Sequence, residues 1–85
     1  MVSSAKRKFV SSHVIGWFSD HFHLPFDYFG EKTSLRDDLL FDNASLVELG
    51  KYFNKAAWTE AKLYPSQYAA CETIGDLIDL ITEHS

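Results

Sequence analysis

Apolar residues recur at intervals of three and four in three stretches of the chain, which is the spacing of one face of an α-helix. The first stretch runs from about Lys6 to His23, and the positions on its predicted buried face are Val10, Val14, Trp17, Phe18 and either His21 or Phe22. Pro25 follows it, and proline disfavours a helical residue directly before it. The pattern therefore predicts a first helix over about residues 6–23.

A second periodic stretch begins near Ser45, with apolar residues at Leu46, Leu49, Tyr52, Phe53, Ala56 and Ala57. Ser45 and Glu48 have the spacing of a capping box, in which the serine hydroxyl and the glutamate carboxylate each accept from a backbone amide at the helix start. We expect a helix from Ser45, as its N-cap, to about Ala61.

The last periodic stretch has an apolar face made of Ile74, Leu77, Ile78 and Ile81. Thr73 is a suitable N-cap for it, with Asp76 three residues on. Before it, Pro65 marks a break, and a short helical turn is predicted over residues 66–70.

Residues 24–42 form a long connection that contains Pro25 and Gly30, which punctuate loops. The connection also carries spaced apolar residues, so we expect it to pack over the helices, with a helical turn near residues 35–40. No stretch shows sustained alternation of period two. The chain is therefore predicted to be all-α, a four-helix bundle with three main helices, one short helix and a long first loop.

The chain has 85 residues, of which 46% are hydrophobic, enough for one domain over residues 1–85. The single cysteine, Cys71, cannot form an internal disulfide, which suits a reducing compartment. No apolar run approaches the roughly 20 residues that span a bilayer. The stretch Met1–Lys8 is polar and basic with no apolar segment behind it, unlike a secretory signal. We expect a cytoplasmic monomer.

From Phe9 onward the chain carries 5 basic and 12 acidic residues, a net charge of −7. Such a body repels phosphate backbones, which argues against nucleic acid and favours partners with a basic docking face.

The sequence contains no nucleophile–base pairing, metal-ligand spacing or phosphate loop, so an enzyme is not expected, and neither catalytic nor metal-binding residues are assigned. His21 and His23 are interpreted as solvent-facing residues at a helix end, and Cys71 as a buried, inert thiol. The aromatic residues Trp17, Phe18, Phe22, Phe53 and Trp58 are expected in the core or at its rim, where they could also line a pocket for an acyl chain.

Residues 72–81, Glu-Thr-Ile-Gly-Asp-Leu-Ile-Asp-Leu-Ile, resemble the last helix of acyl carrier proteins. Three further segments resemble that family in the same order. They are Val14-Ile15-Gly16 in the first helix, Ser34-Leu35-Arg36-Asp37-Asp38-Leu39 before the functional loop, and Ser45-Leu46 at the "Asp-Ser-Leu" that bears the prosthetic group. The resemblance covers about residues 8–82.

The resemblance implies a stand-alone carrier whose Ser45 bears a 4′-phosphopantetheine arm received from coenzyme A. Acyl or aminoacyl groups would travel on that arm as thioesters between enzymes of a fatty-acid, polyketide or specialised pathway. The implied partners are a phosphopantetheinyl transferase and acyl-processing or acyl-transferring enzymes. The predicted second helix carries the acidic residues Glu48 and Glu60 together with the basic residues Lys51 and Lys55. This mixture of charges suggests partner enzymes that are dedicated to this protein.

The family has an aspartate directly before the attachment serine, where this chain has Ala44. A gapless alignment from Leu35 and Leu39 places Asp42-Asn43 over "Asp-Ser" instead, and asparagine cannot carry the arm. The alternative, here called the Ser45 register, places Ser45 over the attachment serine and requires two extra residues in the loop before it. The apolar stripe that follows Ser45 favours this register, and so does the interval of 29 positions from Ser45 to Ile74. Asp42 is then expected near the helix N-terminus.

The Asn43 register predicts a different function, a carrier-shaped protein–protein interaction module that lacks the prosthetic group. In that case Ser45 has no role beyond the helix cap.

Overall fold

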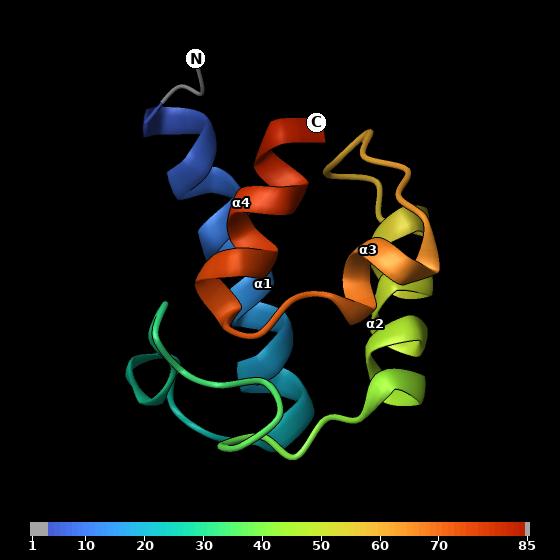
Figure 1. The fold of residues 1–85 in the computed structure, drawn as a ribbon. Helices are drawn as coiled ribbons and strands as arrows, with labels where there is room; N and C mark the ends of the chain where they lie inside the picture. The colour runs from blue at the N-terminus through green and yellow to red at the C-terminus, as the bar shows by residue number, and fades with distance from the viewer. Residues whose placement is uncertain (1–3, 85) are drawn as a thin grey trace.

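The protein, seen here as a computed structural model, is described over residues 4–84. Part of the polar N-terminal stretch, residues 1–3, lies outside the described residues, as does Ser85. The chain folds into α1 (Ser4–Phe22), a 3-10 turn η1 (Phe26–Tyr28), α2 (Asn43–Lys55), α3 (Pro65–Ala69) and α4 (Ile74–His84). The described residues form four α-helices and no strand, as the periodicity predicted (Figure 1).

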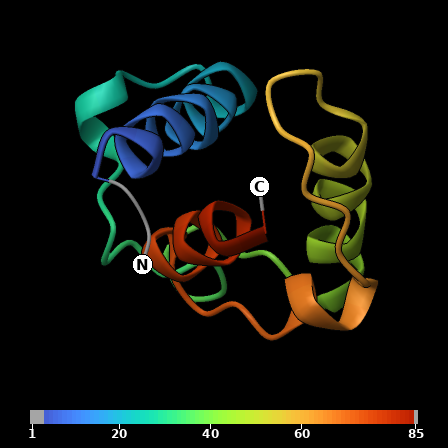
Figure 2. The same cartoon turned by 90° about the horizontal axis from the view of Figure 1, so that it is seen from above.

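The helices pack in two pairs, of which one joins the two ends of the chain. The N-terminal helix α1 packs along the C-terminal helix α4, and the short α3 packs against α2 (Figures 1 and 2). The long first loop, residues 23–42, passes below α1 and α4 in Figure 1 and leads into α2.

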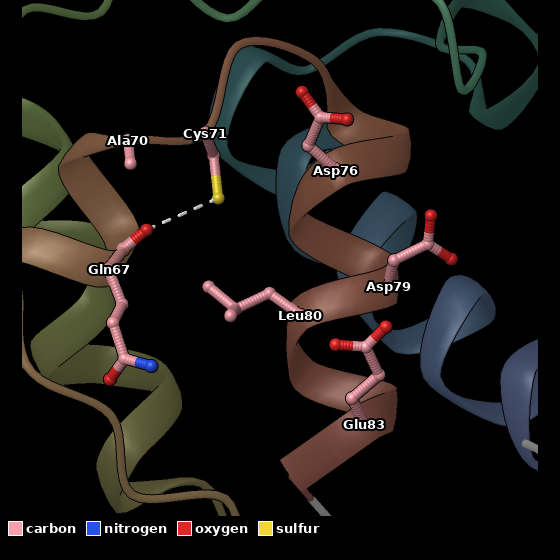
Figure 3. Close-up of a pocket in the computed structure, with 7 residues that line it drawn as sticks. All are labelled: Gln67, Ala70, Cys71, Asp76, Asp79, Leu80 and Glu83. Atoms are coloured by element: carbon pink, nitrogen blue, oxygen red, sulfur yellow. Dashed lines mark hydrogen bonds between the residues drawn. The ribbon is translucent and has the colours of Figure 1, made fainter.

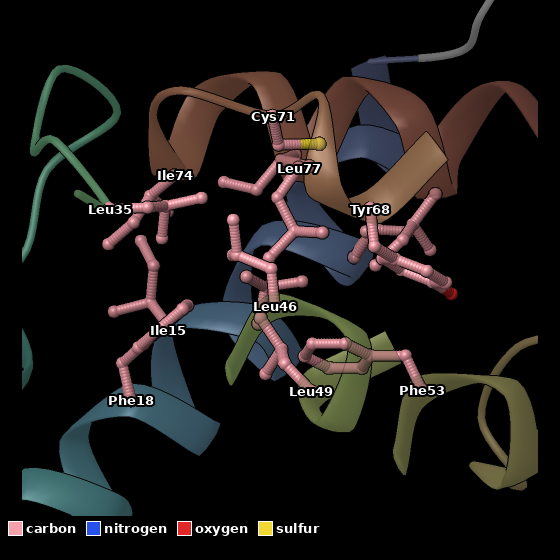
Figure 4. Close-up of a cluster of buried hydrophobic side chains, with 14 of the residues drawn as sticks. Ile15, Phe18, Leu35, Leu46, Leu49, Phe53, Tyr68, Cys71, Ile74 and Leu77 are labelled. Atoms are coloured by element: carbon pink, nitrogen blue, oxygen red, sulfur yellow. The ribbon is translucent and has the colours of Figure 1, made fainter. Parts of the chain in front are cut away.

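The core lies where the four helices and the first loop meet (Figure 4). Phe18, Leu35, Leu46, Phe53 and Leu77 are fully buried in it, and they come from α1, the loop, α2 and α4. Burial of side chains of this size is the main driving force for folding, at roughly 1.5–3 kcal/mol each. Trp17, Phe22 and Trp58 pack against the core at its rim, which confirms the predicted position of the aromatic residues.

The cap predicted for the last helix is confirmed. Thr73 Oγ1 accepts a hydrogen bond from the Asp76 amide at 3.1 Å, and Asp76 Oδ2 accepts from the Thr73 amide at 3.2 Å. This reciprocal pair satisfies amides that the helix itself leaves without partners.

The first loop also satisfies the start of α4. The Ile74 amide donates to the Thr33 carbonyl at 3.1 Å, and the Gly75 amide donates to the Glu31 carbonyl at 2.9 Å. A single β-bridge joins Ser34 and Thr73 beside them. The prediction that this loop packs on the helices is confirmed, although its short helix lies at Phe26–Tyr28, and residues 35–38 form hydrogen-bonded turns instead.

The predicted boundaries of the second helix are wrong at both ends. Asp42 caps the helix, three residues before the expected cap at Ser45, so the first helical residue is Asn43. Ser45 is therefore the third residue of the helix and not its N-cap, and the capping box predicted for Ser45 and Glu48 does not form.

The second helix ends at Lys55, because tertiary contacts override the helix-forming tendency of Ala56 and Ala57. The Asn54 side chain pairs with the backbone of Leu63, donating to its carbonyl at 2.9 Å and accepting from its amide at 3.0 Å. This pairing holds the segment that follows α2 beside the helix, and Ala61 and Leu63 of that segment are buried.

Candidate functional site at the start of α2

The first turn of α2 is organised by Asp42. Asp42 Oδ1 accepts a hydrogen bond from the Ser45 amide at 2.7 Å, and the Asp42 carbonyl accepts the first helical bond from Leu46 at 3.0 Å. The Ser45 amide, and after it the Ser45 hydroxyl, hold the pKa of Asp42 below its ordinary value because they stabilise the ionised carboxylate. The expectation that Asp42 lies near this helix start is confirmed.

Asn43 is the first residue of the helix, and its side chain is already engaged. Asn43 Oδ1 accepts a hydrogen bond of 2.6 Å from Arg36 Nη2, which also donates to the Ala69 carbonyl at 2.6 Å. Arg36 thereby joins the first loop, the start of α2 and the end of α3. This role of Arg36 has no local signal in the sequence, because its partners lie 7 and 33 residues away.

Ser45 is exposed and lines a pocket between α1 and α2. The pocket has a volume of about 270 Å³ and is lined by Trp17, His21, Phe41, Ser45, Glu48 and Leu49. Most of this lining is aromatic or aliphatic, so the pocket can hold an apolar group within reach of the Ser45 hydroxyl.

The buried face of α2 does not distinguish the two alignments of the attachment motif. Leu46, Leu49 and Phe53 of the predicted apolar stripe are buried, but Tyr52 is exposed and Gly50, outside that stripe, is buried. However, helical phase determines which side of a helix faces the core, whereas the cap determines the residue at which the helix begins. The cap is Asp42, so the helix start itself coincides with the Asp42-Asn43 pair of the gapless register.

Leu40 lies two residues before the cap and is unusually placed for a leucine. The residue is 81% exposed, and its φ angle is 60°, in the left-handed region that disfavours residues with a Cβ. The Phe41 amide donates to the Leu35 carbonyl at 2.8 Å, so Leu40 lies in a turn that a backbone hydrogen bond closes.

The thiol of Cys71 lies in a second hollow, between α3 and α4 (Figure 3). Burial, and after it the negative charge of Asp76, raise the pKa of Cys71 to about 11. Its Sγ lies 3.6 Å from the Gln67 carbonyl oxygen. The predicted burial of Cys71 is confirmed, and a thiol that stays protonated is a poor nucleophile, which agrees with the interpretation of Cys71 as inert.

The two histidines at the end of the first helix are exposed. His21 stacks on Trp17, with ring centroids 4.7 Å apart, while His23 ends the helix with a φ angle of 57°. Within residues 4–84 no group of three histidine, cysteine, aspartate or glutamate side chains could hold a metal ion. In the same range no helix is both long and apolar enough to cross a membrane.

No protein-family model matches the chain, and neither a curated protein nor a solved structure shows significant similarity to it. Functional interpretation therefore depends on the residues themselves.

Proposed function

We propose that the protein is a carrier-shaped interaction module that docks a partner protein without bearing a prosthetic group. The observation that carries this proposal is the start of α2 at Asn43, directly behind the Asp42 cap. The acyl carrier resemblance implies an aspartate followed by the modified serine at this place. Here the aspartate is followed by an asparagine, whose side chain has no hydroxyl to form a phosphodiester.

Two further features support docking at this end of the molecule. The Asn43 side chain is engaged by Arg36, so the first turn of α2 is braced by protein groups where an arm would otherwise leave. Leu40 lies beside that turn and is 81% exposed, so a docked partner could cover its apolar side chain.

Intact-mass measurement tests the absence of the arm. The wild-type chain is incubated with coenzyme A, Mg²⁺ and several broad-specificity phosphopantetheinyl transferases, with an authentic carrier protein as the positive control. We expect the control to gain the mass of one arm and the wild-type chain to gain none.

Capture of a partner from cells of the source organism tests docking. Wild type and Ser45→Ala are expected to capture the same protein in the same amount, whereas Leu40→Ser is expected to reduce the capture. Loss of the complex in Ser45→Ala alone would contradict the proposal.

A second candidate function is a thioester carrier with the 4′-phosphopantetheine arm on Ser45. It is favoured by Ser45, which is exposed and lines the largely apolar pocket between α1 and α2. The pocket could hold the acyl group, and docked acyl-processing enzymes would act on the thioester. This candidate predicts that the wild-type chain gains one arm and that Ser45→Ala abolishes the gain.

A further inference from the structure

A third hollow, of about 330 Å³, shares Trp17 with the pocket that Ser45 lines, but Ser45 is not among its own lining residues. It is lined by Ser12, His13, Gly16, Trp17, Asp20, Tyr52 and Trp58. These residues come from α1, from α2 and from the connection that follows α2, so the fold assembles the hollow from three segments.

Aromatic rings form the walls of this hollow. Trp17 and Tyr52 contact each other with ring centroids 5.9 Å apart, and His13 and Trp58 form a second pair at 4.7 Å. The fully buried Phe53 joins the two pairs, because its ring lies 6.1 Å from Trp17 and 5.8 Å from Trp58. Attachment to this core residue holds the walls in place.

Gly16 leaves the α1 side of the hollow open. A Cβ at Gly16 would meet no atom within 4 Å, so packing inside the protein does not require glycine there. Glycine in a helix interior is less favourable than alanine. The empty space over Gly16 is therefore available to a group from outside the protein.

The aromatic lining and its single carboxylate favour a cation. The faces of Trp and Tyr rings attract cations, most strongly where water is displaced. Asp20 is exposed and adds a negative charge to the lining. Arginine suits such a site better than lysine, because its planar guanidinium can stack on a ring and donate two hydrogen bonds to one carboxylate.

We propose that this hollow binds the guanidinium group of an arginine side chain on a docked partner protein. The proposal rests on the docking function proposed above and names the chemistry of the partner. It agrees with the net charge of −7 from Phe9 onward, which favours a basic partner.

An NMR titration tests the site with N-acetyl-arginine methylamide as the probe. The Gly16 amide and the indole N–H groups of Trp17 and Trp58 report on the hollow directly. We expect saturable shifts of these signals with the arginine probe, and much smaller shifts with the citrulline analogue, which has the same shape without the charge.

Three variants locate the binding. Asp20→Asn is expected to weaken binding of the arginine probe about two- to fivefold, the size of an exposed charge interaction. Asp27→Asn removes the same charge from η1, outside the hollow, and is expected to leave binding unchanged. Gly16→Leu fills the hollow and is expected to abolish the shifts, with circular dichroism confirming that the helices persist.

Equal binding of the arginine and citrulline probes, equal binding of a lysine probe, or no saturable shift at Gly16 would each overturn the arginine assignment. None of these results bears on the mass measurement, so the site proposal and the proposed absence of an arm can fail separately.

Discussion

Asp42 determines the residue at which α2 begins, which the residues of the apolar pattern do not. Its carboxylate caps α2 and thereby makes Asn43, and not Ser45, the first helical residue. Aspartate, asparagine and serine are all good N-caps, so the sequence Asp-Asn-Ala-Ser offers three candidate starts within four residues. The apolar stripe cannot choose among them, because it is the same for each.

Asp42→Ala is expected to lower the thermal midpoint of unfolding, since the Ser45 amide loses its acceptor. Asp42→Asn is the matched control, because asparagine caps as well as aspartate but does not titrate in this range.

The difference in stability between wild type and Asp42→Ala is expected to depend on pH. The pKa of Asp42 is lowered in the folded state, so the ionised carboxylate favours folding above the unfolded-state pKa of roughly 4. That stabilisation is lost as the pH falls through the folded-state pKa. Wild type is therefore expected to lose its advantage over Asp42→Ala on acidification, measured by thermal melts between pH 7 and pH 2. An advantage that persists unchanged at the lowest pH would show that the carboxylate charge has no part in the cap.

At the scale of the elements, α2 and α3 are joined by an unusually close approach. A Cβ placed on Gly50 would lie only 2.2 Å from Cδ2 of the Tyr68 ring. Tyr68 is buried and its hydroxyl donates to Asn54 Oδ1 at 2.8 Å, so the ring has little freedom to move. Burial also raises the pKa of Tyr68 to about 12, which keeps this hydroxyl protonated as the donor.

Gly50→Ala is therefore expected to destabilise the protein by about 1–3 kcal/mol, the range for overpacking a core. Gly16→Ala is the matched control in α1, where a Cβ meets nothing, and it should stabilise by about 0.5–1 kcal/mol through helix propensity. Urea denaturation of both variants measures the difference. If both substitutions shift stability in the same direction, the α2–α3 approach is not as close as described.

Arg7, on α1, forms ion pairs on the surface with the first loop and with α4. Its guanidinium donates from Nη1 and Nη2 to the two Glu31 oxygens at 2.9 and 2.6 Å, and from Nε to Asp79 Oδ1 at 2.7 Å. These bonds join α1 to the first loop and to α4. They raise the pKa of Arg7 and hold the pKa of Glu31 below its ordinary value.

Arg7→Ala is expected to destabilise the protein by about 1 kcal/mol or less, because all three side chains are partly exposed and solvent screens the pairs. Added salt should reduce the stability gap between wild type and variant. Lys8→Ala, which removes the neighbouring exposed charge, serves as the control. Thermal melts at low and high salt measure both effects, and a gap that grows with salt would contradict the ion-pair account.

At the scale of the whole molecule, the periodic pattern predicted the all-α architecture and most of the core. The cap of α4 was also predictable, because Thr73 and Asp76 interact locally. The start and end of α2 were not, because they depend on a choice among neighbouring caps and on Asn54 pairing with Leu63. The sequence did not predict the aromatic hollow, because Trp58 lines the same hollow as Trp17 and Tyr52 only once the chain after α2 has folded back along that helix.

The measurement that tests the central claim most directly is the intact mass of four chains after transferase treatment. The chains are wild type, Ser45→Ala, Asn43→Ser, and the double variant Asn43→Ser/Ser45→Ala. If α2 begins where the arm of a carrier would attach, wild type and Ser45→Ala remain unmodified, while Asn43→Ser and the double variant each gain one phosphopantetheine. A gain by wild type that Ser45→Ala abolishes would contradict the account and establish the Ser45 carrier in its place.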